Sequence, residues 1–81
     1  MVEVIFAERF ERVLRKIDES VKIKIKKLIR KIIDVPEIGK PMRYFRKGTR
    51  EVYVSPFRLS YEFDKEKDLL TFLNIYHKDE Q

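Results

Sequence analysis

The sequence has no cysteine, no tryptophan and a single histidine, His77, among its 81 residues. Without cysteine no disulfide can form, and one histidine without clustered ligands leaves no zinc site. A hydrophobic core must therefore hold the chain together, and 81 residues can form one such core with little stability to spare. We expect a single domain over residues 1–81, in the reducing cytoplasm, with no metal and no cofactor.

Long apolar runs are also missing. The longest are a few residues, whereas a helix that crosses a membrane needs roughly 20, and the N-terminus lacks the apolar core of a signal peptide. We therefore expect neither secretion nor membrane insertion. The sequence also lacks a glycine-rich phosphate loop and a serine, histidine and acid in a recognisable order, which argues against the common forms of cofactor-dependent and serine-based catalysis.

Positive charge is what the sequence has in excess. The formal net charge is +5 and the sequence pI is about 9.6, which favours binding to polyanions. The excess is concentrated between residues 40 and 58, where the basic residues outnumber the one acid, Glu51, by five. Besides Arg58, we expect these basic residues to contact RNA phosphates if the protein binds RNA; they are Lys40, Arg43, Arg46, Lys47 and Arg50.

Hydrophobic periodicity predicts one strand and two helices in the first half of the chain. Residues 2–6 form a short strand, and residues 7–17 have apolar positions at helical spacing. Residues 21–35 begin with strand-like alternation, but their apolar positions continue with a period near 3.6, and Pro36 follows where a helix should stop. We interpret this segment as a second helix, capped by residues 18–20.

The second half of the chain has the alternation of strands. Composition marks residues 36–41 as a linker, and the last strand is apolar on both faces in places, which indicates a central position in the sheet. The element order predicts an α+β fold, in which an antiparallel two-helix hairpin packs on one face of a twisted, mainly antiparallel sheet of about four strands. The expected segments are a short strand at 42–45, a turn at 46–48 and strands at 49–55, 57–64 and 69–77.

A hairpin within residues 51–63 carries the best clue to function. Apolar residues alternate along its second strand, so that Arg58 faces away from the core. Pairing with the final strand would bring Arg58 near Tyr76, His77 and Lys78. A slip of one residue in this register would move His77 to the opposite face.

Arginine and histidine suit the cleavage of RNA without a metal ion. The ribose 2′-hydroxyl is then the nucleophile, so the protein need only orient the backbone, stabilise the charge that develops on phosphorus and move protons. A guanidinium stays charged and offers phosphate two parallel hydrogen bonds. On the other reading, Arg58 only pairs with Glu62 or Glu51 on a solvated sheet face, and His77 is an ordinary boundary residue.

Several short motifs carry a family resemblance. Gly48 leads through alternating apolar positions into residues 57–59 (Phe-Arg-Leu) and Tyr61, and the final strand ends in His77 and Lys78. With the opening strand and the helical hairpin, this arrangement resembles the RelE/ParE superfamily of toxins from bacterial and archaeal toxin–antitoxin pairs. The likeness covers nearly the whole chain.

The resemblance implies a toxin held inactive by an acidic cognate antitoxin, in a complex that can be a heterotetramer. The RelE branch implies ribosome-dependent cleavage of mRNA and a block of translation, whereas the ParE branch implies inhibition of DNA gyrase. A degenerate member would only bind its antitoxin or RNA. By position, Arg58 would stabilise the scissile phosphate, Glu51 could act as a base, and His77 and Lys78 match the histidine and basic position at the end of the sheet.

Three features depart from the family pattern. Ser55 and Pro56 replace the usual glycine-containing turn, Tyr53 stands where many members have an arginine, and no tyrosine follows Lys78 as it does in several RNA-cleaving members. RNA cleavage, gyrase inhibition and binding without activity therefore all stay open at the level of sequence.

Overall fold

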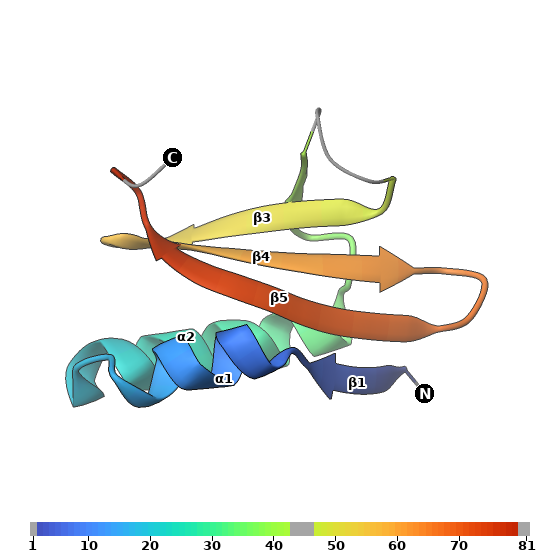
Figure 1. The fold of residues 1–81 in the computed structure, drawn as a ribbon. Helices are drawn as coiled ribbons and strands as arrows, with labels where there is room; N and C mark the ends of the chain where they lie inside the picture. Colours follow the sequence, from blue (N-terminus) through green and yellow to red (C-terminus); the bar gives the residue numbers. More distant parts are fainter. Residues whose placement is uncertain (1, 43–46, 80–81) are drawn as a thin grey trace.

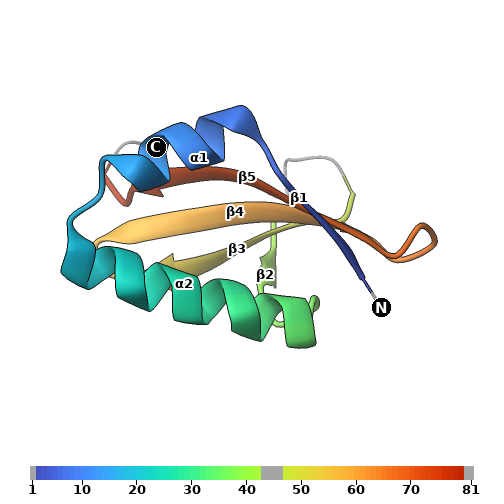
Figure 2. The same ribbon diagram turned by 90° about the horizontal axis from the view of Figure 1, so that it is seen from below.

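The computed structural model describes residues 2–42 and 47–79. Figure 1 shows two layers, with both helices on one side of a twisted sheet. Seen from below in Figure 2, the two helices run in opposite directions beneath the strands, as the sequence predicts. The elements are β1 (Glu3–Phe6), α1 (Glu8–Arg15), α2 (Glu19–Asp34), β2 (Lys40–Pro41), β3 (Thr49–Val54), β4 (Phe57–Asp64) and β5 (Leu69–His77).

The strands form one sheet in the order β1-β5-β4-β3-β2. Strand β1 pairs in parallel with β5, and every other pairing is antiparallel. The predicted α+β fold with a mainly antiparallel sheet is therefore confirmed, although the sheet has five strands where about four were expected. The central position predicted for the last strand is also confirmed, since β5 lies between β1 and β4.

The predicted helix ends are wrong by two residues each, about half a turn, at the connection between the helices. Helix α1 ends at Arg15, and the amide of Ile17 donates to the carbonyl of Leu14 in a tighter final turn. Helix α2 begins at Glu19 with Asp18 as its N-cap residue. The Asp18 side chain makes no capping hydrogen bond, because its Oδ2 accepts a hydrogen bond of 2.6 Å from Ser20 Oγ.

The expected linker contains a strand that the sequence analysis missed. Lys40 and Pro41 pair with Glu51 and Arg50 as the two-residue strand β2. Pro41 has no amide hydrogen to donate, and it is tolerated because β2 is an edge strand. Of the strand predicted at 42–45, residue 42 lies just outside β2 and residues 43–45 lie outside the described residues.

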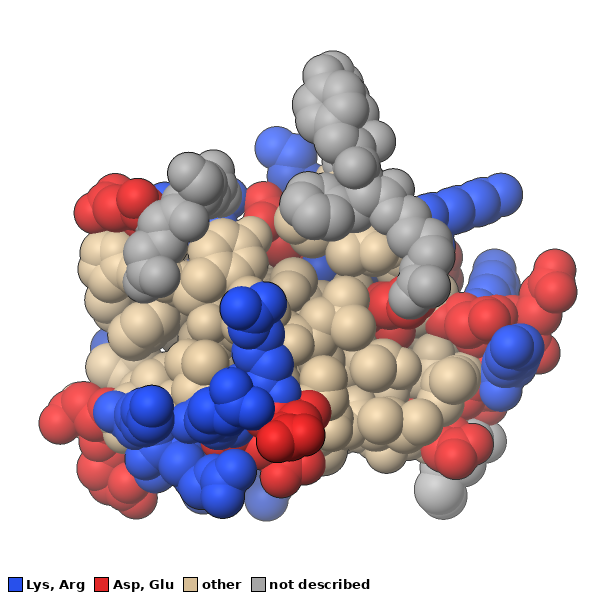
Figure 3. All heavy atoms as spheres, in the orientation of Figure 1, with Lys and Arg blue, Asp and Glu red and all other residues tan. Residues whose placement is uncertain are grey.

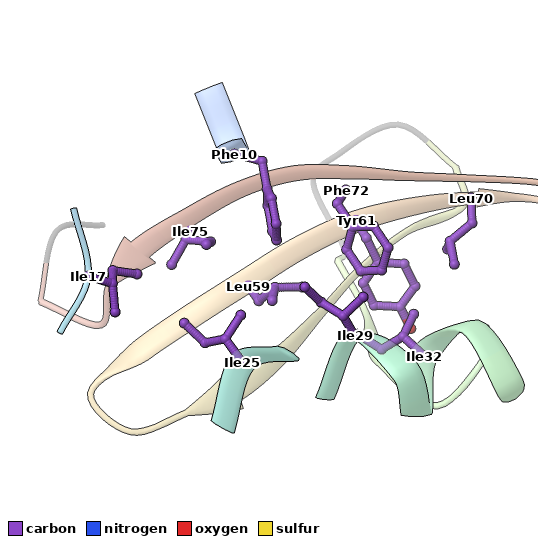
Figure 4. Packing of buried hydrophobic residues seen from close by; sticks show 10 residues of the cluster. All are labelled: Phe10, Ile17, Ile25, Ile29, Ile32, Leu59, Tyr61, Leu70, Phe72 and Ile75. Atoms are coloured by element: carbon purple, nitrogen blue, oxygen red, sulfur yellow. The ribbon is translucent and has the colours of Figure 1, made fainter. Parts of the chain in front are cut away.

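The core fills the space between the helical layer and the sheet. Figure 4 shows large apolar side chains from both layers pointing toward one another across this space. The pattern follows from the periods of the two layers, because every second residue of a strand and every third or fourth residue of a helix faces the interior. The core residues are Phe10, Ile17, Ile25, Ile29, Ile32, Leu59, Tyr61, Leu70, Phe72 and Ile75.

The connection between α2 and β2 is held by hydrogen bonds to two side chains of the sheet, Tyr61 and Arg50. Tyr61, which is fully buried, accepts a hydrogen bond from the amide of Gly39 and donates one to the carbonyl of Pro36, both at 2.8 Å. Arg50 Nη1 donates to the carbonyl oxygens of Glu37 and Gly39 at 3.1 and 2.7 Å. Gly39 is needed for this contact, since a Cβ atom there would lie 2.5 Å from the Tyr61 hydroxyl.

We expect Tyr61→Phe to lower the free energy of unfolding by about 2 kcal/mol, because the amide of Gly39 and the carbonyl of Pro36 would lose their partner at a buried site. Urea denaturation followed by circular dichroism measures this change. Tyr53→Phe is the matched control, since the Tyr53 side chain is exposed. Equal stability of the two variants would contradict the assigned role of the Tyr61 hydroxyl.

Burial raises the pKa of Tyr61 above its usual value of about 10. The hydrogen bond from Gly39 and the charge of Arg50 lower this pKa, but their effect is smaller than that of burial. The folded state thus keeps this proton at a pH where the unfolded chain loses it. The resulting stability is fully present below about pH 10 and is lost as the pH rises through the folded-state pKa. We expect the stability difference between wild type and Tyr61→Phe to shrink above pH 10 in urea titrations, while it stays constant between pH 7 and 9.

Candidate functional site

The two helices leave the opposite face of the sheet uncovered (Figure 1). We call its part on β3, β4 and β5 the free face. Direct partners in neighbouring strands point to the same side of a sheet, so the register assigns two rows of side chains to it. The rows are Tyr53, Arg58 and Tyr76, and next to them Glu51, Ser60 and Asn74.

Three side chains on the free face are joined through one carboxylate. Arg58 Nη1 donates to Glu51 Oε1 at 2.9 Å, and the Tyr76 hydroxyl donates to Glu51 Oε2 at 2.8 Å. Glu51 is 20% exposed and Arg58 is 35% exposed, so the pair is partly shielded from water. We refer to Glu51, Arg58 and Tyr76 as the Glu51 cluster.

Arg58 keeps donor capacity beyond this ion pair. Its Nε atom is buried and has no hydrogen-bond partner among the described residues. A guanidinium has five N–H groups, and leaving one of them buried without an acceptor costs about 1–3 kcal/mol. A ligand that offers an acceptor to a shifted Arg58 side chain would recover this free energy.

Local structure explains why Arg58 lies here. The two-residue connection Ser55 and Pro56 joins β3 to β4 and sets Val54 opposite Phe57, as the predicted turn requires. Arg58 is the next residue along and therefore falls opposite Tyr53, with its side chain directed away from the helices.

A β-bulge decides which residues of β5 share the free face. The register between β4 and β5 shifts between Ser60 and Tyr61, which pair with Asn74 and Phe72 and so skip Leu73. The extra residue reverses the alternation for the rest of the strand. Tyr76 consequently lies opposite Arg58.

The structure does not bring His77 and Lys78 into the Glu51 cluster. His77 lies opposite Phe57, on the side of the sheet that carries the helices, and its ring meets the Phe57 ring edge-on at 5.8 Å. Its Nδ1 accepts a hydrogen bond from the amide of Asp79 at 3.3 Å. Lys78 follows the end of β5 and is exposed. His77 and Lys78 lie at the end of the sheet nearest Arg58, and their role in the site stays a prediction.

The predicted phosphate-binding residues lie in different settings. Lys40 and Lys47 are exposed. Arg50 instead lies on the helix side of β3, opposite Tyr61, where its guanidinium holds residues 37–39. Arg43 and Arg46 lie outside the described residues.

Other charged regions of the surface are less suited to a polyanion. Figure 3 shows basic side chains gathered over the helical layer with acidic ones among them, and there Arg12 pairs with Glu8 at 3.3 Å. A hollow of about 350 Å³ at the other end of the free face has a mixed lining of two acidic residues, one basic residue and two uncharged ones, namely Glu62, Asp64, Lys67, Leu69 and Thr71.

Across residues 2–42 and 47–79 no group of three histidine, aspartate or glutamate side chains could hold a metal ion. In the same ranges no helix is long and apolar enough to span a membrane.

Several solved structures of RelE toxins have the same fold. The isolated Escherichia coli RelE toxin has a TM-score of 0.84 at 19% identity, over 100% of this chain and 88% of that one. The RelBE2 toxin–antitoxin complex of Mycobacterium tuberculosis gives 0.79 at 25%, over 95% and 98% of the two chains. The archaeal RelE–RelB complex of Pyrococcus horikoshii gives 0.80 at 9%, over 99% and 98%. The fold is that of the RelE class of toxins.

A family model described as the ParE toxin of the type II toxin–antitoxin system parDE matches residues 4–81. No curated protein matches the chain. The chain therefore belongs to the ParE toxin family, within the RelE/ParE superfamily that its sequence resembles, and is a toxin of a type II toxin–antitoxin system.

The predicted pairing put Tyr76 near Arg58, but the hydrogen bond from Tyr76 to Glu51 was not foreseen. The pattern of β5 holds the missing signal. Phe72 and Ile75 are both buried although they are three residues apart, a spacing that only a bulge allows within one strand.

We expect Tyr76→Phe to lower the free energy of unfolding by about 1 kcal/mol, because one oxygen of Glu51 loses its donor. In a Glu51→Ala background the same substitution should cost almost nothing, since the acceptor is already gone. A double-mutant cycle in urea measures this coupling. Strict additivity of the two substitutions would contradict the hydrogen bond.

Proposed function

We propose that this toxin is a ribosome-dependent endoribonuclease that cleaves mRNA without a metal ion and so blocks translation in the cytoplasm. The observation that carries the proposal is the Glu51 cluster, in which an arginine and a tyrosine share one carboxylate on the sheet face that the helices leave uncovered. A positively charged group and a carboxylate base are what transfer of a phosphate ester to a 2′-hydroxyl requires.

Arg58 would bind the scissile phosphate. As the 2′-oxygen attacks, negative charge builds up on the phosphoryl oxygens, and a guanidinium can stabilise that charge through two parallel hydrogen bonds. The Nε of Arg58 supports this role, because it has no acceptor among the described residues and a phosphate oxygen would supply one once the side chain shifts to expose it.

Glu51 would act as the base. Its carboxylate would accept the proton of the 2′-hydroxyl while the 2′-oxygen bonds to phosphorus. The bond from phosphorus to the 5′-oxygen would break, and the 5′-oxygen would take a proton from solvent water, which yields a cyclic 2′,3′-phosphate and a 5′-hydroxyl. The Tyr76 hydroxyl holds one oxygen of the carboxylate, so Tyr76 acts as a positioning residue. His77 and Lys78 lie farther along at the sheet end and are proposed to contact the RNA beyond the scissile phosphate.

Exposed lysines would hold the RNA backbone. Lys40 and Lys47 present their charge to solvent, whereas Arg50 is used within the protein, so we propose phosphate contacts for the two lysines and for Arg43 and Arg46. Such contacts release counterions, and binding should therefore weaken steeply with salt.

An acidic antitoxin is the proposed protein partner. The relatives from M. tuberculosis and P. horikoshii were solved as toxin–antitoxin complexes, and the net charge of +5 suits an acidic segment. A segment that becomes ordered on binding can wrap a large surface. Two toxins and two antitoxins in a heterotetramer are the proposed assembly.

Inhibition of DNA gyrase is the second candidate function. The match of residues 4–81 to the ParE toxin model favours it. In that case the Glu51 cluster would be a structural ion pair on a protein-binding face, and the toxin would leave RNA intact.

We expect the purified toxin to cut mRNA in the A site of translating ribosomes, and Arg58→Ala to lower the cleavage rate at least about 100-fold, because the developing charge on the phosphate loses its partner. Glu51→Gln should have an effect of similar size, since the amide cannot accept the proton. Primer extension on the mRNA measures the rate.

Arg12→Ala is the matched control, because Arg12 is also ion-paired to a glutamate but lies in the helical layer. It should leave cleavage unchanged, and circular dichroism must show that every variant is folded. Intact mRNA together with inhibited gyrase supercoiling would establish the second candidate function in place of the first. If Arg58→Ala kept the activity of the wild type, whether mRNA cleavage or gyrase inhibition, Arg58 would be excluded from the site.

A further inference from the structure

An exposed tyrosine stands beside Arg58 on the free face. Tyr53 of β3 lies directly opposite Arg58 of β4, which in turn lies opposite Tyr76 of β5. Tyr53 is 53% exposed, and among the described residues its side chain has no hydrogen bond, ion pair or ring contact.

The other exposed large apolar residues lie elsewhere. Ile23 belongs to α2, Val35 and Ile38 follow that helix, and Ile5 and Phe6 belong to the distant edge strand β1. Within the described part of β3, β4 and β5, Tyr53 is therefore the large apolar group that the free face offers to a ligand.

The edge of β3 beside Tyr53 is the next feature that matters for a ligand. Strand β2 pairs only with Arg50 and Glu51, so among the described residues no strand covers the edge of β3 beside Tyr53. A tyrosine ring has few rotatable bonds and loses little entropy when it stacks. Side chains directly opposite each other in a sheet have Cβ atoms about 5 Å apart, which makes Tyr53 and Arg58 direct neighbours on the free face.

We propose that Tyr53 stacks on an unpaired RNA base next to the phosphate that Arg58 binds. The choice of RNA as ligand rests on the proposed function. An aromatic ring next to a phosphate-binding arginine matches the alternation of base and phosphate along a single strand. The exposed Lys78 lies past the end of β5, at the sheet end nearest Arg58, so the strand would leave the site in that direction.

Stacking of this kind tolerates any base, because every base has an aromatic face. Tyr53 would thus fix the position of a nucleotide without specifying its identity. A purine, with its larger ring system, should bind more tightly than a pyrimidine.

The test measures equilibrium binding of a short fluorescein-labelled single-stranded RNA by anisotropy. A 2′-O-methyl group on each ribose prevents cleavage. Tyr53→Ala should weaken binding about tenfold, because one base loses its stacking partner. Tyr53→Phe keeps the ring and should bind like the wild type. Ile23→Ala is the matched control, since Ile23 is 50% exposed but lies on α2.

Abasic nucleotides identify the stacked base. At one position an abasic site should weaken binding to the wild type by about tenfold and abolish the difference between wild type and Tyr53→Ala. Equal affinity of wild type and Tyr53→Ala for the intact RNA would overturn the proposal. So would a difference that persists at every abasic position, or a wild-type protein that does not bind the RNA.

The outcomes also separate this inference from the proposed function. If cleavage depends on Arg58 but RNA affinity does not change in Tyr53→Ala, the nuclease proposal stands and the stacking proposal is rejected. Binding that depends on Tyr53 and on one base, without any cleavage on ribosomes, would support the stacking and remove the nuclease.

Discussion

The hydroxyl group of Tyr61 links strand β4 to the segment between α2 and β2. It is buried beneath the sheet, and its two hydrogen bonds hold the segment that leaves α2. Arg50 of β3 donates hydrogen bonds to two carbonyl oxygens of the same segment. With that segment fixed, β2 reaches the edge of β3, and the helices stay confined to one face. The opposite face of the sheet carries the Glu51 cluster.

The sequence was sufficient for the fold class because hydrophobic period is a local property. Period 3.6 over residues 21–35 and period 2 from residue 49 onward identified the helices and long strands. Strand β2 was missed for the opposite reason. Lys40 and Pro41 have no strand pattern of their own, and their conformation is set by hydrogen bonds to residues about ten positions away.

The candidate site could be predicted only in part. Hairpin pairing was enough to bring Glu51 near Ser60 and Arg58 near Tyr76. It could not decide the side on which His77 lies, because that depends on one extra residue, Leu73, in the ladder between β4 and β5. The use of Arg50 inside the protein also escaped prediction, since composition counts charges without showing what each one contacts.

In the free protein, the carboxylate of Glu51 competes with any incoming anion for Arg58. Its carboxylate lies 2.9 Å from Arg58, so an incoming phosphate meets a guanidinium whose charge is already balanced. A free anion that collides with this site gains little, because it must displace a partner that is tethered in place and carries the same charge. Only a ligand that makes additional contacts elsewhere can displace the Glu51 carboxylate from Arg58. Binding of a phosphate to Arg58 therefore depends on how much of the rest of the ligand is already bound.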